Sequence, residues 1–186
     1  ACKTEDESMA QMRPQITASN GTFTLDQLSN TDLSDFQKLT INKNSPASYI
    51  NVTFPQAQII KAISLTTDAL RESWAIKPAT CNHSLEYSLD GIKWVRLCEI
   101  PDGGVYEQTV SFPAVKARFF RVQFRNPSGI SMRKASVKVS ELVLHSASYI
   151  NHFEDKAGYY TAYDTDVFIT PHDQGVNDVV DITKYM

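Results

Sequence analysis

Hydrophobic and polar residues alternate along short runs over most of the chain. In the run 49–54, Ile50, Val52 and Phe54 fall on one face of an extended chain, with polar residues between them. A period of two is typical of a half-buried β-strand. Runs of this kind, rich in β-branched and aromatic residues, predict strands at 15–19, 49–54, 59–66, 84–88, 94–100, 106–111, 118–124 and 138–145.

Turn-forming residues separate the predicted strands. Asp90-Gly91 is typical of a hairpin, the run 101–104 is typical of a loop, and Pro113 is expected to end the strand before it. The stretch 25–38 favours a loop or one helical turn, because its Asp, Asn and Ser side chains compete for backbone hydrogen bonds. Eight short strands without a long helix predict an all-β fold, an antiparallel two-sheet sandwich of the jelly-roll type.

The pattern changes after about residue 147. Residues 148–186 contain seven acidic and two basic side chains, together with many aromatic and apolar ones, which is too apolar for a solvated linker. We therefore expect a leader segment at 1–14, the sandwich at 15–147 and an irregular, acidic and aromatic extension at 148–186 that packs on another surface.

The amino-acid composition excludes several classes of protein. The 186 residues are 42% hydrophobic and 21% charged, as in ordinary globular proteins, so a disordered chain is excluded. No apolar run is long enough for a membrane-spanning helix. The net charge of −3 gives no general attraction to a phosphate backbone, so nucleic acid is not an expected partner.

The three cysteines are too few for a disulfide scaffold. Cys81 and Cys98 lie on two neighbouring predicted strands and would form a bridge only if the register put them on one face, so free thiols are favoured. Ala1-Cys2 matches the end of a bacterial lipoprotein signal, in which the cysteine becomes the lipidated first residue, or it belongs to an internal piece of a longer chain.

No catalytic motif is present. The sequence lacks the glycine patterns of nucleotide-binding loops, the Gly-x-Ser-x-Gly elbow of hydrolases and the paired histidines of zinc sites. A glycosidase needs a pair of acids, for which Glu154-Asp155 and Asp164/Asp166 are the candidates, but such closely spaced acids usually form a solvated surface. We expect no catalytic residue in this chain.

Several stretches resemble discoidin-like domains, also known as coagulation-factor C-type domains, which have the galactose-binding fold. The hairpin 84–94, with its Tyr-Ser-x-Asp-Gly-x-x-Trp pattern, resembles theirs, as do the stretches 47–58, 116–124 and 139–144, in the same order. The resemblance covers residues 15–145 and implies a β-sandwich of that type. It also implies that Trp94 is a core residue.

Other stretches resemble family 106 glycoside hydrolases, which are α-L-rhamnosidase-like enzymes. These are the opening 1–7, the join 13–19, the segment 151–158 and the end 178–186. In that family a discoidin-like sandwich is inserted in the chain of a catalytic barrel. The resemblance implies an internal domain of a bacterial polysaccharide-degrading enzyme, located in the periplasm, outside the cell or at the outer membrane. The barrel of the same polypeptide would be its partner, and Cys2 would lie in a connecting strand.

The discoidin-like resemblance implies a calcium site, and the residues of this chain leave open whether the site is kept. Related sugar-binding domains hold the ion between the loop after the first strand and a glutamate of the last strand, and calcium prefers oxygen ligands. The matching residues are Asp32, Asp35 and Glu141, but an aspartate and a glycine of the usual loop are replaced. An Asx-rich turn, with Glu141 paired to a base, is the alternative.

Sugar binding in such domains uses aromatic rings and polar donors on loops at one end of the sandwich. The loop 68–81 provides Trp74 and Arg71, and His83 follows it. The alternative is that Trp74 packs against its own domain or a neighbouring barrel.

Three functions follow from these features. The first is a non-catalytic accessory domain that braces the barrel of a secreted α-L-rhamnosidase-like enzyme. The second is a carbohydrate-binding module that itself recognises a glycan of plant polysaccharide. The third is a domain for cell-surface adhesion or protein interaction, which the fold supports by analogy alone.

Overall fold

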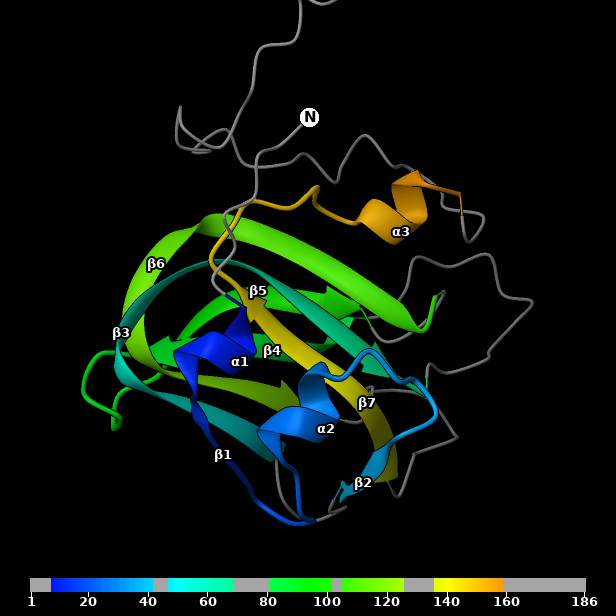
Figure 1. The fold of residues 1–186 in the computed structure, drawn as a ribbon, viewed down its shortest axis with the longest axis horizontal. Coiled ribbons are helices and arrows are strands. Elements are labelled where there is room, and N and C mark those ends of the chain that lie inside the picture. The colour runs from blue at the N-terminus through cyan, green and yellow to red at the C-terminus, as the bar shows by residue number, and fades with distance from the viewer. Residues whose placement is uncertain (1–7, 42–46, 69–80, 102–104, 126–135, 159–186) are drawn as a thin grey trace, which may run out of the picture.

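The computed structural model describes residues 8–41, 47–68, 81–101, 105–125 and 136–158. Seven strands and three short helices occur in this part of the chain (Figure 1). In chain order they are α1 (Met9–Met12), β1 (Gln15–Ala18), α2 (Leu25–Ser29), β2 (Gln37–Thr40), β3 (Ser48–Thr67), β4 (Cys81–Ser88), β5 (Val95–Pro101), β6 (Glu107–Phe124), β7 (Ser136–His145) and α3 (Phe153–Lys156).

Two long bent strands join the layers of the sandwich. All the strand pairs are antiparallel, in the order β2-β7-β3-β6-β4-β5, with β1 on β3. The first half of β3 pairs with β1 and the second half with β7, while the second half of β6 pairs with β4. The strands β3 and β6 curve round the left side of Figure 1 and so belong to both layers. The predicted all-β sandwich is confirmed.

The prolines explain why the sequence predicted too many strands. The strands predicted at 49–54 and 59–66 are one strand, β3, and those predicted at 106–111 and 118–124 are one strand, β6. The pairing register of β3 with β6 shifts after Thr53 and again after Ile60. Pro55 and Pro113 lie next to these shifts, where a residue without an N–H is tolerated. The expectation that Pro113 ends a strand was therefore wrong.

The core lies between the two layers. Phe54 and Phe120 are fully buried and meet edge to face, with ring centroids 5.9 Å apart and planes at 82°. Alternating residues of the long strands line this core, because successive side chains of a strand point to opposite faces. The largest fully buried aliphatic side chains are Met9, Leu28, Leu39, Ile50, Ile60, Ile63, Leu65, Leu85 and Ile100.

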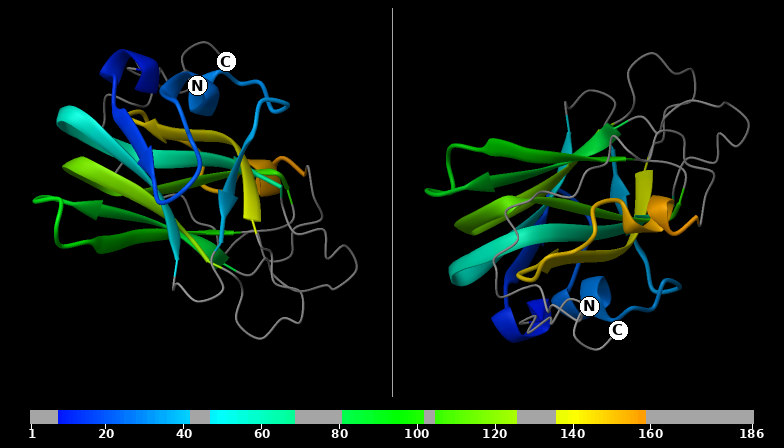
Figure 2. Two further views of the ribbon diagram at one scale, coloured as in Figure 1. Left: turned by 90° about the horizontal axis from the view of Figure 1, so that it is seen from below. Right: turned by 90° about the horizontal axis from the view of Figure 1, so that it is seen from above.

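Two short helices pack on one side of the strands (Figure 2). In α1, which falls in the predicted leader, Ser8 and Gln11 form a capping box and Met9 and Met12 are buried in the core. In α2, which matches the predicted helical turn, buried Gln27 donates from Nε2 to the carbonyl oxygens of Val139 and Ser140. Part of the leader therefore belongs to the packed domain.

The described part of the extension, residues 148–158, covers the outer face of β6. The backbone N–H of His152 donates to the carbonyl oxygen of Thr109 at 2.8 Å, and Glu154, only 4% exposed, accepts from the backbone and hydroxyl of the same residue. Glu154 was expected on a solvated surface. It is buried instead, because α3 turns its carboxylate toward the sheet.

Two further predictions concern cysteine and the membrane. Cys98 is a half-buried thiol that lies opposite Leu85, while Cys81 lies opposite Pro101, so the predicted thiol form is confirmed for Cys98. Cys2 lies outside the described residues. Among the described helices, none is long and apolar enough to cross a membrane.

Candidate functional site

One end of the sandwich collects the ends of most strands. Because β3 and β6 bend in the middle, the first and last residues of both strands lie at the same end. His83 of β4 lies opposite Phe124 at the end of β6 and opposite Ile100 of β5, so these ends of β4 and β5 lie at the same end of the sandwich. We call this the loop end. The bends of β3 and β6 and the hairpin that contains Gly91 form the opposite end.

The predicted sugar-binding loop connects two strand ends at the loop end. Trp74 and Arg71 lie outside the described residues, so their placement stays a prediction. His83 is only 2% exposed and stacks against Phe124 with ring centroids 4.9 Å apart. The inward face of β4 carries this ring, so His83 supports the core and does not present a donor at the surface.

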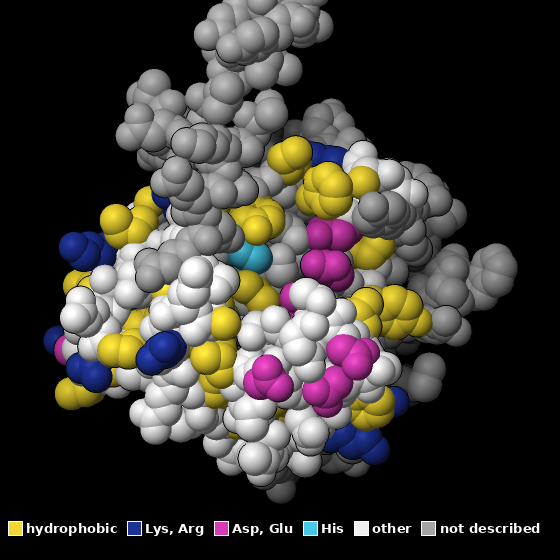
Figure 3. All heavy atoms as spheres, viewed as in Figure 1, with side chains coloured by type: hydrophobic (Ala, Val, Ile, Leu, Met, Phe, Trp, Pro, Cys, Tyr) yellow, Lys and Arg dark blue, Asp and Glu magenta, His cyan; other side chains and the backbone are white. Residues whose placement is uncertain are grey.

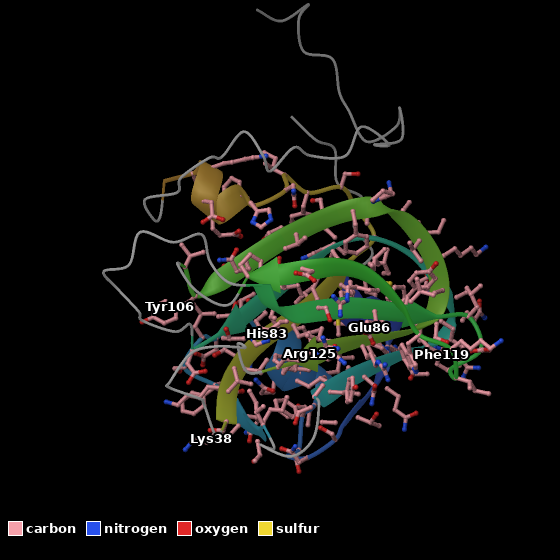
Figure 4. All side chains as sticks on the ribbon, turned by 180° about the vertical axis from the view of Figure 1, so that it is seen from behind. Lys38, His83, Glu86, Tyr106, Phe119 and Arg125 are labelled. Atoms are coloured by element: carbon pink, nitrogen blue, oxygen red, sulfur yellow. The ribbon has the colours of Figure 1, made fainter. Side chains whose placement is uncertain are left out.

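Two further residues lie at the loop end. Arg125 directly follows β6, and its Nε is buried without a hydrogen-bond partner. Tyr106 directly precedes β6 and is 49% exposed. Figure 4 shows both residues at the same end as His83, far from Phe119 at the other end. The unpartnered guanidinium nitrogen of Arg125 is a candidate donor, and the exposed ring of Tyr106 at the same end is a candidate stacking surface.

The sequence-predicted calcium ligands fall into two places. Asp32 lies in an Asx turn, where its Oδ1 accepts from the backbone and hydroxyl of Ser34 at 2.9 and 2.6 Å. These hydrogen bonds lower the pKa of Asp32. Asn30 donates to the carboxylate of Asp35 at 2.9 Å. Glu141 lies on the outer face of β7, opposite Thr66 of β3.

Among the described residues, no three His, Cys, Asp or Glu side chains are arranged to hold a metal. Figure 3 shows acidic side chains in two groups on this face, one over α2 and the loop after it and one below α3. The first group agrees with the Asx-rich turn that the sequence left as an alternative. A calcium ion shared by Asp32, Asp35 and Glu141 stays a prediction.

Comparisons with known proteins give matches only at the level of structure. No protein-family model matches this chain, and no curated protein matches it either. A rhamnosidase from Novosphingobium sp. PP1Y matches 86% of the chain with a TM-score of 0.69 at 22% identity. A pectin binding carbohydrate binding module matches 70% of it with a TM-score of 0.51 at 15% identity. A family 32 module of NanJ from C. perfringens, solved with galactose, matches 75% with a TM-score of 0.52 at 10% identity. The fold is that of a discoidin-like, galactose-binding-like domain.

The two kinds of match differ in how much of the other protein they cover. The chain spans only 14% of the rhamnosidase chain, whereas it spans 88% and 98% of the two carbohydrate-binding modules. At identities this low the likeness defines the fold, and the ligand and the parent protein are separate questions.

The outer face of the discoidin-like domain carries an arginine between aromatic rings. The guanidinium carbon of Arg121 lies 4.3 Å from the ring centroid of Tyr49 and 4.1 Å from that of Trp94, and its Nε donates to Glu86 at 2.7 Å. Trp94 is half-buried and outside the core, so the expectation of a core tryptophan was wrong. The Trp94 ring instead covers the guanidinium of Arg121, which is partly shielded from solvent and paired with Glu86.

Two glutamates of the domain repel each other across Thr66. Burial and the nearby charges of Glu141 and Glu154 raise the pKa of Glu107, and burial raises that of Glu141, while His145 opposes both shifts. A carboxyl whose pKa is raised by folding favours the folded state when it is protonated. The ionised pair therefore costs stability at neutral pH.

We expect Glu107→Gln to raise the thermal unfolding midpoint at pH 7 with EDTA present. The gain should shrink as the pH falls through the raised pKa of Glu107 and should vanish below pH ~4, under the unfolded-state pKa, where the carboxyl of the wild-type chain is protonated in both states. Calorimetric melting at several pH values measures this. Glu99→Gln is the control, because Glu99 is 47% exposed and paired with Arg96. A gain that does not depend on pH would contradict the repulsion.

Proposed function

We propose that this chain is a non-catalytic accessory domain that binds carbohydrate for a larger polysaccharide-degrading enzyme of the α-L-rhamnosidase type. The observation that carries the proposal is the fold match to carbohydrate-binding modules along nearly their whole length, together with the match to a small part of a rhamnosidase. The sequence stretches that resemble family 106 enzymes support the same parent. Because such a parent enzyme would degrade polysaccharide, we infer a periplasmic, extracellular or outer-membrane location.

The proposal assigns hydrolysis to a catalytic barrel elsewhere in the polypeptide. A glycosidase needs two carboxyl groups that face a sugar from both sides. In the described part of the chain, Glu154 is held by Thr109 and Asp155 lies 3.3 Å from Nδ1 of His152, so both carboxylates serve local structure. We expect no turnover of an aryl rhamnoside by this chain alone.

The binding site proposed for the glycan is the loop end. Trp74 would stack on a sugar face, and Tyr106, which is 49% exposed, would extend that surface. Arg125, a half-buried residue whose Nε has no protein acceptor, would donate to a sugar hydroxyl or carboxylate once its guanidinium turns toward the glycan. Arg71 is the second basic residue that the sequence places in the adjoining loop.

Titration calorimetry with rhamnose-containing pectic oligosaccharides tests this site. We expect saturable binding that is weakened about tenfold or more by Trp74→Ala and by Arg125→Ala, because each removes one main contact of a small interface. Arg96→Ala is the matched control, since Arg96 is exposed and paired with Glu99 on β5. Equal affinity in Arg125→Ala and Arg96→Ala would place the glycan elsewhere.

A bracing domain without glycan affinity is the second candidate, and the hairpin at the opposite end favours it. Leu89, Ile92 and Val95 are 74%, 80% and 50% exposed within this one hairpin. Clustered exposed apolar residues are typical of interaction surfaces. If no pectic fragment binds, and if Ile92→Lys weakens association with a separately produced barrel, bracing is the function. An adhesion domain would instead bind cell-surface ligands without the barrel.

A further inference from the structure

A group of polar and aromatic side chains lies on the outer face of the layer that contains β3, β6 and β4. Asn51, Arg121 and Glu86 lie directly opposite one another across these three strands. The residues next to them along each strand pack in the core, so these three side chains point to the outer face. Figure 4 shows Glu86 between His83 at the loop end and Phe119 at the opposite end. We call this group the outer-face cluster.

The guanidinium of Arg121 is held in one orientation within the cluster. Its carbon lies 4.3 Å from the ring centroid of Tyr49 and 4.1 Å from that of Trp94, and its Nε donates to Oε2 of Glu86 at 2.7 Å. The side chain is still 21% exposed, and neither Nη group has an acceptor among the described residues. A donor that is already ordered loses little conformational entropy when a ligand binds. The two Nη groups are therefore preorganised to donate outward.

Acceptors lie on both sides of this donor. Glu86 is only 8% exposed, and its Oε1 accepts no hydrogen bond from the described part of the chain. Arg96, directly opposite Glu86 on β5, donates to Glu99 instead. Asn51 donates through Nδ2 to Thr17, which leaves its Oδ1 without a donor in the same part of the chain. A carboxylate oxygen in a nearly buried side chain gains from a donor, so the cluster favours a ligand that both donates and accepts.

We propose that the outer-face cluster binds an uncharged sugar residue. A hydroxyl group both donates and accepts, so one sugar hydroxyl would accept from the Nη groups of Arg121 and its neighbours would donate to Glu86 and Asn51. The exposed parts of the Tyr49 and Trp94 rings would pack against the C–H groups of the sugar. Because Glu86 neutralises Arg121, the pair has no net charge and gives no preference for an acidic sugar.

This site is separate from the loop end. Arg125 follows Arg121 by four residues, a distance of about 13 Å along an extended strand. The inference rests on the proposed function only for the class of ligand, carbohydrate, and places a second sugar at residues to which the loop end does not contribute.

The fluorescence of Trp94 provides a readout of the outer-face cluster alone. The chain has two tryptophans, Trp74 and Trp94, so the full chain with Trp74→Phe keeps Trp94 as its only indole. We expect rhamnose oligosaccharides to change its emission saturably, with the same affinity at low and high salt, because no net charge takes part. Galacturonic acid oligosaccharides should leave the emission unchanged.

Substitutions in the same Trp74→Phe chain separate binding from packing. Arg121→Lys should weaken binding about tenfold or more, because it removes the planar fork of donors. Asn51→Ala should weaken it about threefold or more and leave the fold intact, since the hydrogen bond of this side chain is exposed. Asn30→Ala is the matched control, because Asn30 contacts Asp35 in the turn after α2. It should bind as the chain without it does.

Glu86→Gln gives a change of specificity that a purely structural cluster would not show. The glutamine oxygen still accepts from Arg121, so the packing is kept, but the positive charge of Arg121 is no longer compensated. We expect galacturonic acid oligosaccharides to change the Trp94 emission of this variant, with an affinity that falls as salt is added.

Two results would overturn the outer-face site. The first is a Trp94 emission that does not respond to rhamnose oligosaccharides, and the second is equal affinity in Asn51→Ala and Asn30→Ala. Calorimetry of Arg125→Ala reports on the loop end separately. Weaker binding in Arg125→Ala with a silent Trp94 keeps the proposed function and rejects the outer-face site. A Trp94 response with no effect of Arg125→Ala supports the outer-face site and rejects the loop end.

Discussion

Phe120→Ala lowers the free energy of unfolding by about 3–5 kcal/mol, the largest change that we expect from one substitution. Phe120 is fully buried in the middle of β6, opposite Val52 of β3 and Tyr87 of β4. Its ring meets Phe54 edge to face across the core. The substitution removes the buried ring surface, the aromatic pair and the packing between layers, and it leaves a cavity that rigid strands cannot close.

Urea denaturation followed by fluorescence measures this loss. Since whole domains are stable by about 5–15 kcal/mol, the variant should retain a cooperative transition at a clearly lower urea concentration. Phe36→Ala is the control of the same residue type, because Phe36 is 38% exposed and contacts Lys138 at 4.3 Å. It should cost about 1 kcal/mol or less. Equal losses in the two variants would mean that the core is not where the structure places it.

Glu154→Ala is expected to cost about 2–3 kcal/mol and to loosen residues 148–158 from the sheet. The Glu154 carboxylate accepts from Thr109 at 2.9 Å through its N–H and at 2.6 Å through its hydroxyl. Removing the carboxylate leaves the buried backbone N–H of Thr109 without its acceptor and leaves the Thr109 hydroxyl with Ser64, 3.0 Å away, as its remaining partner. Relief of the repulsion that Glu154 exerts on Glu107 offsets only a small part, because burial and the Glu141 charge do more than Glu154 to raise the pKa of Glu107.

Hydrogen exchange of the Thr109 amide together with urea denaturation provides the readout for Glu154. Glu154→Gln should recover part of the loss, since its amide oxygen still accepts one hydrogen bond. Glu99→Ala is the matched control and should cost less than about 1 kcal/mol, because its ion pair with Arg96 is exposed. If the Thr109 amide stays protected in Glu154→Ala, the segment is held by other contacts and this prediction is wrong.

The strands were well predicted where their signal is local. The alternation of Ile50, Val52 and Phe54 identified a strand and its buried face, and Asp90-Gly91 identified the β4–β5 hairpin. The short strand β2 was missed, because the exposed residues Gln37, Lys38 and Thr40 surround the single buried Leu39. Its pairing with β7, about a hundred residues later, has no local signature.

The sites were predicted less well, because they depend on side-chain direction. His83 was predicted as a surface donor, but the register with Phe124 turns its ring inward. Trp94 was predicted in the core, but it covers Arg121 on the outer face. Arg125 carries no motif, and only its buried, unpartnered Nε distinguishes it from other basic residues.

The sequence by itself determined the class of this domain, an all-β antiparallel sandwich, and the resemblance of its hairpin 84–94 to discoidin-like domains supplied the type. A period of two and turn chemistry are properties of neighbouring residues, so they can be read without knowing what lies across the sheet. Only the tertiary structure decided that β3 and β6 continue through Pro55 and Pro113. It also decided that Glu107 and Glu141 meet across Thr66. These features depend on pairing between residues far apart in the chain, which packing of the whole sandwich selects.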